Sequence, residues 1–422
     1  MVFYARRIRS LHFHYEGDLF NIHLDLSIAF LTRINQLDAF LSLRGLTVDA
    51  GLIKFQHTTL RTLSPPNLED LTVTQVTLSP QEEIWSKSSL ETLARKSCHI
   101  KTLVVEGNHT SITFNVLPNF SKVQNLTMYF RNPTVISLSL LEQIASSMIS
   151  LQSLEMDLEP AEFKNDLNSS SCQFMSLTDL VVSGPLQSVG KVLEVVHAPS
   201  LCHLSLGIGI QAYGFDTCTS IQSFIPVKMI DKVQSFSVSS ARYTIQRPGP
   251  IDFGSRISPF IIFEQLEEFD VHVPTLRIST THLAMFLNNN RYLSNLQHLT
   301  LQYDRPREIN QSLSIAALPL IADACPKLLH LAVSIYDPDQ SEMRITTRSA
   351  HNLHTIRFDP LPDWNESTIL ATALSSFLDH LFPGLIDSDY WSREVSCASR
   401  ELREKWWKGV QDMIKAHQIR RV

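Results

Sequence analysis

The stretch LEEFDV at residues 266–271 is followed thirty residues later by LQHLTL at residues 296–301. Both stretches follow the pattern apolar-x-x-(Leu or Phe)-x-apolar. In an extended strand, residues i and i+2 point to the same side. We therefore expect Phe269 and Val271 to face a core while Glu268 faces outward. One such strand cannot bury its apolar side alone, so the pattern predicts a partner strand from each neighbouring copy.

The pattern occurs thirteen times along the chain, at a mean spacing of about 29 residues and with intervals from 23 to 35. The hexamers begin at Ile8, Leu43, Leu68, Ile100, Val123, Leu151, Leu177, Leu201, Val233, Leu266, Leu296, Leu328 and Leu353. Leucine-rich repeats have a period of about 20–29 residues. The spacing predicts an α/β leucine-rich-repeat solenoid, a horseshoe with parallel strands on its concave face.

The segments between the hexamers return the chain across the convex face. Residues 140–148, 282–289 and 317–325 carry apolar residues at helical spacing, whereas residues 157–172 read as irregular. The alternative is an ordinary α/β protein with a doubly wound parallel sheet. Such a sheet favours a glycine-rich first turn, but the chain has 13 glycines in 422 residues and no G-x-G-x-x-G motif. The solenoid is the favoured interpretation.

We expect two domains: a solenoid of about thirteen irregular repeats at residues 1–385 and a C-terminal helical cap at residues 386–422. The terminal faces of a repeat stack need such caps. In the cap, Trp391, Val395, Leu402, Trp406 and Val410 fall roughly on one helical face. At the other end the first hexamer lies almost at the N-terminus, and we expect a further segment to precede Met1.

Composition argues against several classes of function. The net charge is −6 and the basic residues are scattered, so we expect no nucleic-acid partner. No run of about 18 apolar residues occurs, so we expect no membrane partner. The N-terminus lacks the apolar core of a signal peptide, which favours a cytoplasmic or nuclear location. The six cysteines form no C-x-x-C pair and are interpreted as buried reduced thiols.

The opening segment YARRIRSL at residues 4–11 resembles the stretch that follows the F-box and linker in a group of fungal, mainly basidiomycete, F-box proteins. In that group a Y-A-x-R-[VI]-R-x-L stretch opens the repeat array. A short helix, a cysteine and then L-x-x-L-x-L is also typical of F-box repeat proteins. Here residues 322–333 (ADACPKLLHLAV) have this form, and residues 94–105 (ARKSCHIKTLVV) are a weaker copy. The resemblance covers about residues 3–385.

The resemblance implies a solenoid that recognises a protein substrate for ubiquitination. The F-box itself, which docks on the Skp-type adaptor of the ligase, is absent from the sequence and would lie before Met1. A Skp-type adaptor is therefore expected as a partner only if an F-box precedes Met1. A truncated gene model or a degenerate copy would explain the difference.

The candidate partner-binding surface consists of outward strand residues on three successive repeats. Neighbouring strands lie ~4.8 Å apart, so Glu268, His298 and His330 are expected side by side. Asp270, His272 and Thr300 extend the same face. The alternatives are a metal site or an acid–base pair, in which Glu268 would raise the pKa of His298, and a simple solvated surface. We assign no catalytic residue, no metal ligand and no cofactor.

Three functions follow from these observations. The first is a non-catalytic solenoid that binds a protein substrate on its concave face, as in an F-box subunit of a ubiquitin ligase. The second is a free-standing leucine-rich-repeat scaffold or inhibitor with no ubiquitin role. The third is an enzyme that uses the histidine and glutamate row. The sequence favours the first and predicts that the protein is not an enzyme.

Overall fold

The computed structural model divides the chain into two compact units. The structure describes residues 7–13, 42–49, 65, 67–75, 80–107, 114–130, 135–158, 162–164, 171–209, 232–240, 251–252, 263–273, 276–289, 291–303, 313–337, 343, 351–358, 368–390 and 397–420. Unit 1 consists of Met1–Leu201, Leu206–Gly209 and Phe224–Met229, and unit 2 consists of Cys202–Ser205, Ile210–Ser223 and Ile230–Val422.

The thirteen repeat hexamers supply thirteen strands of a 14-stranded sheet whose strands follow chain order, and the fourteenth strand comes from the segment that was expected to form only a cap. In unit 1 these strands are β1 (Ser10–Phe13), β2 (Gly45–Asp49), β3 (Asp70–Gln75), β4 (Thr102–Gly107), β5 (Asn125–Phe130), β7 (Ser153–Asp157) and β10 (Asp179–Pro185). They pair parallel, and their central apolar residues are aligned, as in Leu11 with Leu46 and Leu46 with Leu71. The expected parallel pairing is confirmed within this unit.

Unit 2 repeats the arrangement. Its strands are β13 (Ser235–Ser240), β15 (Glu268–His272), β17 (His298–Gln302), β19 (His330–Val333), β21 (Thr355–Phe358) and β22 (Asp387–Tyr390). Each pairs parallel with the next, and Phe236, Phe269, Leu299, Leu331 and Ile356 align at the central position. Strand β12 (His203–Gly209) is divided between the two units.

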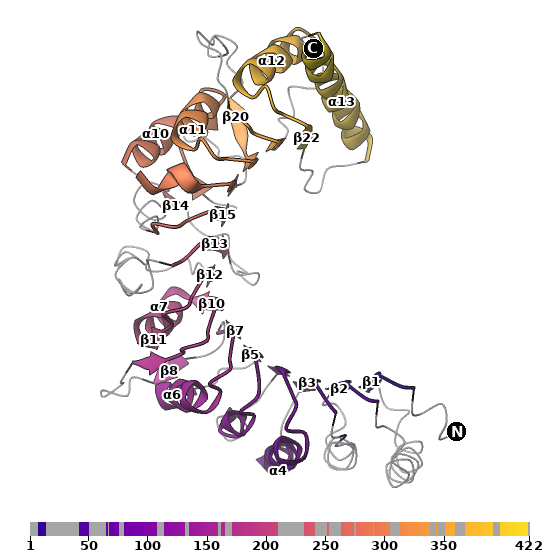
Figure 1. Cartoon of the computed structure of the whole chain (residues 1–422), viewed down its shortest axis with the longest axis vertical. Coiled ribbons are helices and arrows are strands. Elements are labelled where there is room, and N and C mark those ends of the chain that lie inside the picture. Colours follow the sequence, from indigo (N-terminus) through magenta and orange to yellow (C-terminus); the bar gives the residue numbers. More distant parts are fainter. Residues whose placement is uncertain are drawn as a thin grey trace. The chain divides into compact units, whose positions relative to one another are not determined.

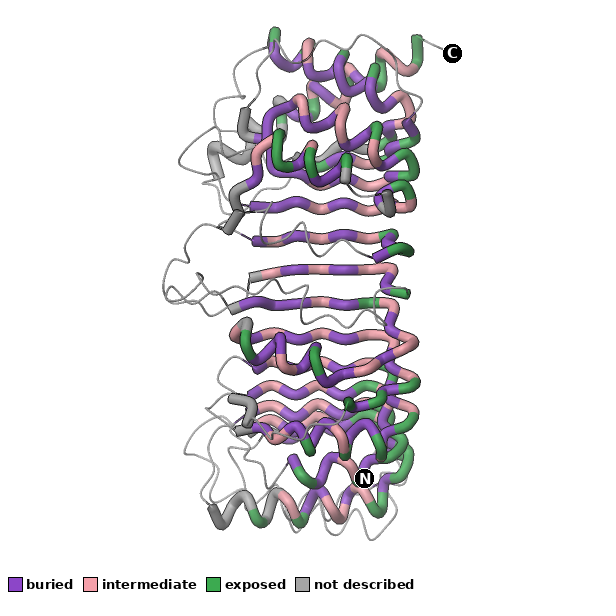
Figure 2. Tube along the Cα trace, turned by 90° about the vertical axis from the view of Figure 1, so that its left-hand side faces the viewer, coloured by how far each residue is buried: buried purple, intermediate pink, exposed green. Residues whose placement is uncertain are grey.

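Side chains alternate between buried and half-exposed along the strands, as Figure 2 shows for successive rungs. In β15, for example, Phe269 and Val271 are completely buried while their neighbours are half-exposed. The buried side faces the crossover helices, which in Figure 1 lie on one side of the strands in each unit. The shared hydrophobic spine predicted from the hexamers is therefore confirmed, and the fold is an α/β leucine-rich-repeat solenoid.

The crossovers contain helices at the predicted places and at others. The helices are α4 (Pro80–Lys96), α6 (Leu138–Ser147), α7 (Leu186–Val195), α10 (Thr280–Asn289), α11 (Ala317–Ala324), α12 (Thr368–Leu381) and α13 (Cys397–Ile419), with 3-10 turns η3 (Leu117–Asn119) and η7 (Arg291–Asn295). Helix α6 begins after Ser137, whose hydroxyl accepts a hydrogen bond from the Ser139 N–H. Helix α11 ends at Ala324 and is capped by Cys325, after which Pro326 prevents further helical hydrogen bonding.

Short strands in the crossovers form four two-stranded parallel sheets. These are β6 (Val135–Ser137) with β8 (Glu162–Lys164), β9 (Cys172–Gln173) with β11 (Val196–His197), β14 (Ile251–Asp252) with β16 (Leu276–Arg277), and β18 (Leu313–Ser314) with β20 (Ile335–Asp337). The segment at 157–172, expected to be irregular, thus contains β8, and its residues 159–161 and 165–170 lie outside the description. Each short sheet ties one crossover to the next.

The segment 386–422 contributes both a strand and the expected helix. Strand β22 pairs with β21, and α13 packs against α12 and β22. Val410 is completely buried, as expected, and is joined by Trp407 and Ile414. The side chains of Leu402 and Trp406 and the whole of residues 391–396, which include the other predicted face residues, lie outside the described part. Within the described residues, no helix has the length and apolarity needed to cross a membrane.

The cysteines agree only in part with the expectation of buried reduced thiols. Cys98, Cys172 and Cys325 are free thiols. Cys172 and Cys325 are buried, but Cys202 is only half-buried and Cys98 is exposed. The interpretation of Cys98 as a buried thiol was wrong because it follows the end of helix α4, at a turn that solvent reaches. Cys218 and the side chain of Cys397 lie outside the description.

Candidate functional site

The six candidate residues lie on three neighbouring strands of unit 2. Glu268, Asp270 and His272 alternate along β15 with buried Phe269 and Val271. The three acidic and imidazole side chains are half-exposed, on the side of the strand away from the core. Side chains alternate between the two faces of a strand. Because Phe269 and Val271 occupy the core face, the residues between and beside them face the solvent.

Parallel pairing aligns the rest of the set in register. Glu268 is the Cα partner of His298 on β17, and His298 is the partner of His330 on β19. Asp270 is the partner of Thr300. The structure therefore brings all six residues onto one continuous face, which we call the outward patch: Glu268, Asp270, His272, His298, Thr300 and His330.

The two central imidazoles of the outward patch stack on each other. The ring centroids of His298 and His330 are 4.3 Å apart, and the ring planes differ by 20°. His330 Nδ1 is also hydrogen-bonded to the Thr355 hydroxyl on β21, at 2.7 Å. These contacts fix the orientation of the His330 ring, because the stack fixes its plane and the hydrogen bond fixes its rotation.

The environment of His330 disfavours the protonated ring. Burial is the main cause that lowers the pKa of His330, and the nearby positive or ionisable side chains of His298, His354 and Arg357 lower it further. This direction is opposite to the effect that a neighbouring carboxylate would have on an imidazole. At neutral pH the His330 side chain is thus a neutral hydrogen-bonding and aromatic group.

A metal site was one of the alternatives considered for Glu268, His298 and His330. In the ranges that the structure describes, no group of three or more histidine, cysteine, aspartate or glutamate side chains has the geometry to hold a metal ion. What the outward patch offers is two carboxylates on β15 beside a stacked imidazole pair, with the exposed Arg357 on β21 beyond them. Such an arrangement can form hydrogen bonds, aromatic contacts and ion pairs with a bound molecule.

Beside the outward patch, a residue of β17 departs from the alternation that the sequence predicts. Gln302, the Cα partner of His272, occupies an outward position but is only 7% exposed. Its Oε1 has no hydrogen-bond partner among the described residues. The adjacent Tyr303 hydroxyl donates to the Ser334 carbonyl and accepts from the Leu313 N–H, so β18 and the residue between β19 and β20 contact the end of β17 here. Tertiary packing, which period-two alternation does not include, buries this position.

Unit 1 has a polar cluster that the candidate list did not contain. The Tyr129 hydroxyl on β5 donates a hydrogen bond to Glu155 on β7 at 2.7 Å. Burial, this hydrogen bond and the nearby carboxylates of Glu155, Glu106 and Asp157 raise the pKa of Tyr129 to about 12. The available signal was the position of Tyr129, which shares the outward side of its strand with Asn125 and Thr127.

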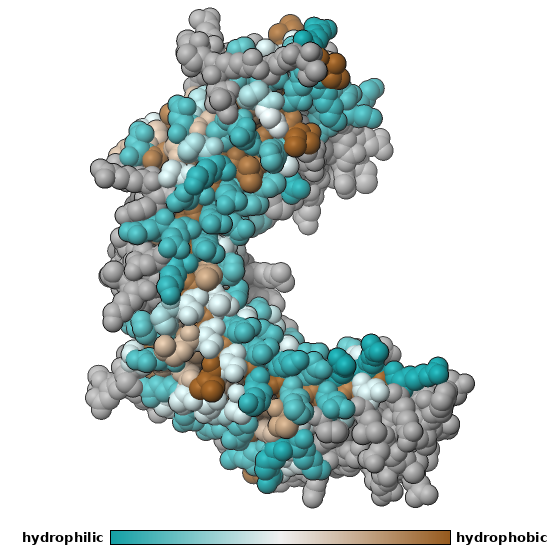
Figure 3. Space-filling model, in the orientation of Figure 1, coloured by the Kyte–Doolittle hydropathy of each residue, from teal (hydrophilic) through white to brown (hydrophobic). Residues whose placement is uncertain are grey.

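Hydrophilic residues cover most of the described surface in Figure 3. The exposed large apolar side chains of the described residues are scattered over both units: Ile84, Ile149 and Met175 in unit 1, and Met285, Ile369, Ile386 and Ile419 in unit 2. They lie outside the outward patch, whose side chains are polar. The character of the patch therefore favours a polar and charged contact rather than an apolar groove.

Comparison with known proteins finds likeness in solved structures alone. No protein-family profile matches the chain, and no curated protein matches it. An internalin of Listeria monocytogenes is 13% identical, over 84% of this chain and 82% of that chain, with a TM-score of 0.35. The complex of Rad7 and Elc1 in yeast gives 15% identity, 76% and 70% coverage, and a TM-score of 0.36. The leucine-rich-repeat-containing protein LegL7 of Legionella pneumophila gives 15% identity, 83% and 93% coverage, and a TM-score of 0.36. At such values these proteins are similar to this chain in type of fold and indicate nothing about what it binds.

Proposed function

We propose that this chain is a non-catalytic repeat protein that binds a protein partner on the outward patch of unit 2. The observation that carries the proposal is the stacked His298–His330 pair, whose His330 ring is hydrogen-bonded to Thr355 and whose flank is formed by the carboxylates of β15. A surface whose side chains are already ordered loses less conformational entropy on binding than a mobile one.

The charges across the outward patch favour specificity. Glu268 and Asp270 place negative charge on β15, and Arg357 places positive charge three rungs away on β21. The imidazole pair lies between them. A complementary partner presents positive charge opposite β15 and negative charge opposite β21. This requirement excludes partners with other charge patterns more than it raises affinity.

The outward patch is tested by changes of charge. Glu268→Lys reverses a charge on β15, His298→Glu introduces a negative charge at the imidazole pair, and Asp323→Lys on the exposed side of α11 is the matched control. We expect affinity capture followed by mass spectrometry to give a set of partners with the unmodified chain and the control. The same partners should be lost or weakened with both outward-patch variants. Equal capture by all four proteins would contradict the proposal.

We further propose that the partner is a substrate for ubiquitination. The support is the resemblance of residues 4–11 and 322–333 to F-box repeat proteins, and the second segment forms a helix, a cysteine and a strand as that resemblance implies. A Skp-type adaptor enters only if an F-box precedes Met1. Location in the cytoplasm or nucleus is part of the same proposal.

The ubiquitin role is tested on the captured partner. Deletion of the gene should raise the partner's abundance and lower its polyubiquitination, and restoring the Glu268→Lys variant should not reverse either change. Unchanged abundance and ubiquitination, with capture intact, would favour the second candidate, a free-standing scaffold or inhibitor that uses the same surface.

A further inference from the structure

A row of charged side chains precedes the first four strands of unit 1. We call it the leading row: Arg9, Arg44, Glu69 and Lys101, each two residues before the central leucine of its hexamer. The Arg44 and Gly45 N–H groups both donate to the Arg9 carbonyl, at 2.8 and 2.9 Å, and the same paired bonds recur at the next two rungs. The backbone of the leading row is thereby held at the spacing of the strands.

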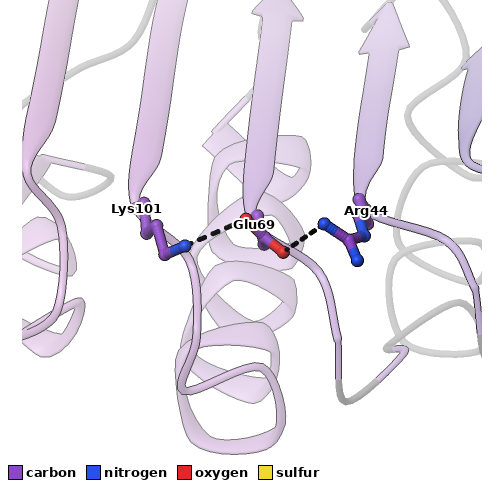
Figure 4. A network of polar contacts seen from close by, with 3 residues as sticks. All are labelled: Arg44, Glu69 and Lys101. Atoms are coloured by element: carbon purple, nitrogen blue, oxygen red, sulfur yellow. Dashed lines mark hydrogen bonds and ion pairs between the residues drawn. The ribbon is translucent and has the colours of Figure 1, made fainter.

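Glu69 joins two of the cations in the leading row. Its Oε1 lies 3.3 Å from Arg44 Nη1 and its Oε2 lies 3.0 Å from Lys101 Nζ (Figure 4). The hydrogen bond from Lys101 is the main cause that lowers the pKa of Glu69, with further contributions from the charges of Lys101 and Arg44. One carboxylate thus stands against three cations, and the row carries an excess of positive charge.

The leading row borders an open hollow of about 500 Å³. Besides the leading row, Ser42, Asn67 and His99 line it, so every lining side chain is polar or charged. A hydroxyl, an amide and an imidazole stand beside the two arginines. Such a lining suits a ligand with several hydrogen-bond acceptors and a negative charge, and it offers nothing to an apolar ligand.

We infer that this hollow binds a phosphomonoester dianion between Arg9 and Arg44. The two residues lie on adjacent rungs, and guanidinium groups bind phosphate oxygens through paired N–H donors. A ligand carboxylate would compete with Glu69 for Arg44 at equal charge, whereas a phosphate brings about twice the charge and three acceptor oxygens. Glu69, which is itself bonded by Lys101, orients Arg44.

The phosphate is carried by a phosphorylated serine or threonine of a protein partner. This assignment rests on the proposed function, in which the chain binds a protein. The other source of the same chemistry is free inorganic phosphate. A nucleic-acid backbone is disfavoured, because the chain has a net charge of −6 and these cations border one hollow rather than a stripe.

The inference is tested with the full chain and small probes, by isothermal titration calorimetry at low ionic strength. The probes are a short phosphoserine peptide, the same peptide without phosphate, inorganic phosphate and a single-stranded oligonucleotide. Arg9→Gln and Arg44→Gln should each weaken binding of the phosphopeptide by roughly tenfold to a hundredfold, the effect of losing a charge-assisted hydrogen bond. The matched control is Lys122→Gln, which removes an exposed cation elsewhere in unit 1 and should leave the affinity unchanged.

Circular dichroism of each variant checks that the fold is retained. Arg44→Lys keeps the positive charge but lacks the paired N–H donors of the guanidinium group, so it should recover part of the affinity. Tighter binding of the phosphopeptide than of inorganic phosphate identifies the phosphorylated partner as the source, and equal binding identifies free phosphate. The inference is overturned if the phosphopeptide does not bind, if Arg44→Gln binds it as well as the unmodified chain, or if the oligonucleotide binds more tightly. These probes need no partner protein, so their failure is distinct from a failure of the outward-patch test.

Discussion

Replacing Leu299 by alanine tests the hydrophobic spine of unit 2. Leu299 lies on β17, is 2% exposed, and is aligned with Phe269 on β15 and Leu331 on β19. The change removes three carbon atoms from the core, at about 0.8 kcal/mol each. Backbone hydrogen bonds hold the strands on both sides, so the space cannot close fully, and the residual cavity adds to the cost. We expect a loss of about 3–4 kcal/mol in the free energy of unfolding.

The measurement is urea denaturation followed by circular dichroism. With a denaturant slope of about 1–3 kcal/mol per molar urea, the midpoint should fall by about 1 M or more. The matched control is Thr300→Ala, at the next position of the same strand, whose half-exposed side chain should contribute less than about 1 kcal/mol. A shift of one residue in the strand would exchange the two faces. A larger loss for Thr300→Ala than for Leu299→Ala would therefore refute the assignment of the spine.

Three further outcomes follow from the structure. The pKa of the Tyr129 phenol is raised to about 12, so the contribution of this group to stability is complete below pH 10 and is lost as the pH rises toward 12. Alkaline unfolding of the unmodified chain, compared with that of Tyr129→Phe, measures this contribution, and identical unfolding profiles would contradict it. Because the pKa of His330 is lowered in the folded chain, the unfolded chain binds more protons, and the stability of the fold decreases as the pH drops below 6.5. A nuclear magnetic resonance titration of the His330 ring should give a midpoint below 6.5, and this midpoint should rise in His298→Asn. A midpoint that does not change in His298→Asn would be inconsistent with the stacked pair. Cys98 should be alkylated in the native protein, whereas Cys325, whose pKa burial raises to about 12, should react only after unfolding, as peptide mapping by mass spectrometry can determine; reaction at equal rates would argue against this placement.

The sequence predicted the strands well because the signal was repeated thirteen times. Each hexamer places apolar residues at two-residue spacing, and each became a strand of the same sheet. Crossover helices were harder to predict. Helix α11 was predicted because its apolar residues recur at helical spacing, and Ala317, Leu318, Ile321 and Ala322 are all buried in the structure. Helix α4 has a mainly polar sequence without helical periodicity, and only its end, at residues 94–96, was implied as helical by the resemblance.

The neighbour relations in the outward patch were also predictable. Glu268, His298 and His330 align because parallel strands of one repeat pair at equivalent positions. The sequence did not contain the contacts that these side chains make. The ring stack of His298 on His330 and the hydrogen bond to Thr355 depend on rotamers, which neighbouring atoms determine.

The hydrophobic spine and the order of the rungs follow from the sequence alone, because every hexamer contains the same two-residue spacing of apolar residues. Tertiary structure alone decided which polar side chains meet, such as Arg44 with Glu69 and Glu69 with Lys101. It also buried Gln302 at an outward position. These two ion pairs join residues 25 and 32 positions apart in the chain, and their geometry depends on the three-dimensional path of each crossover rather than on the repeat period.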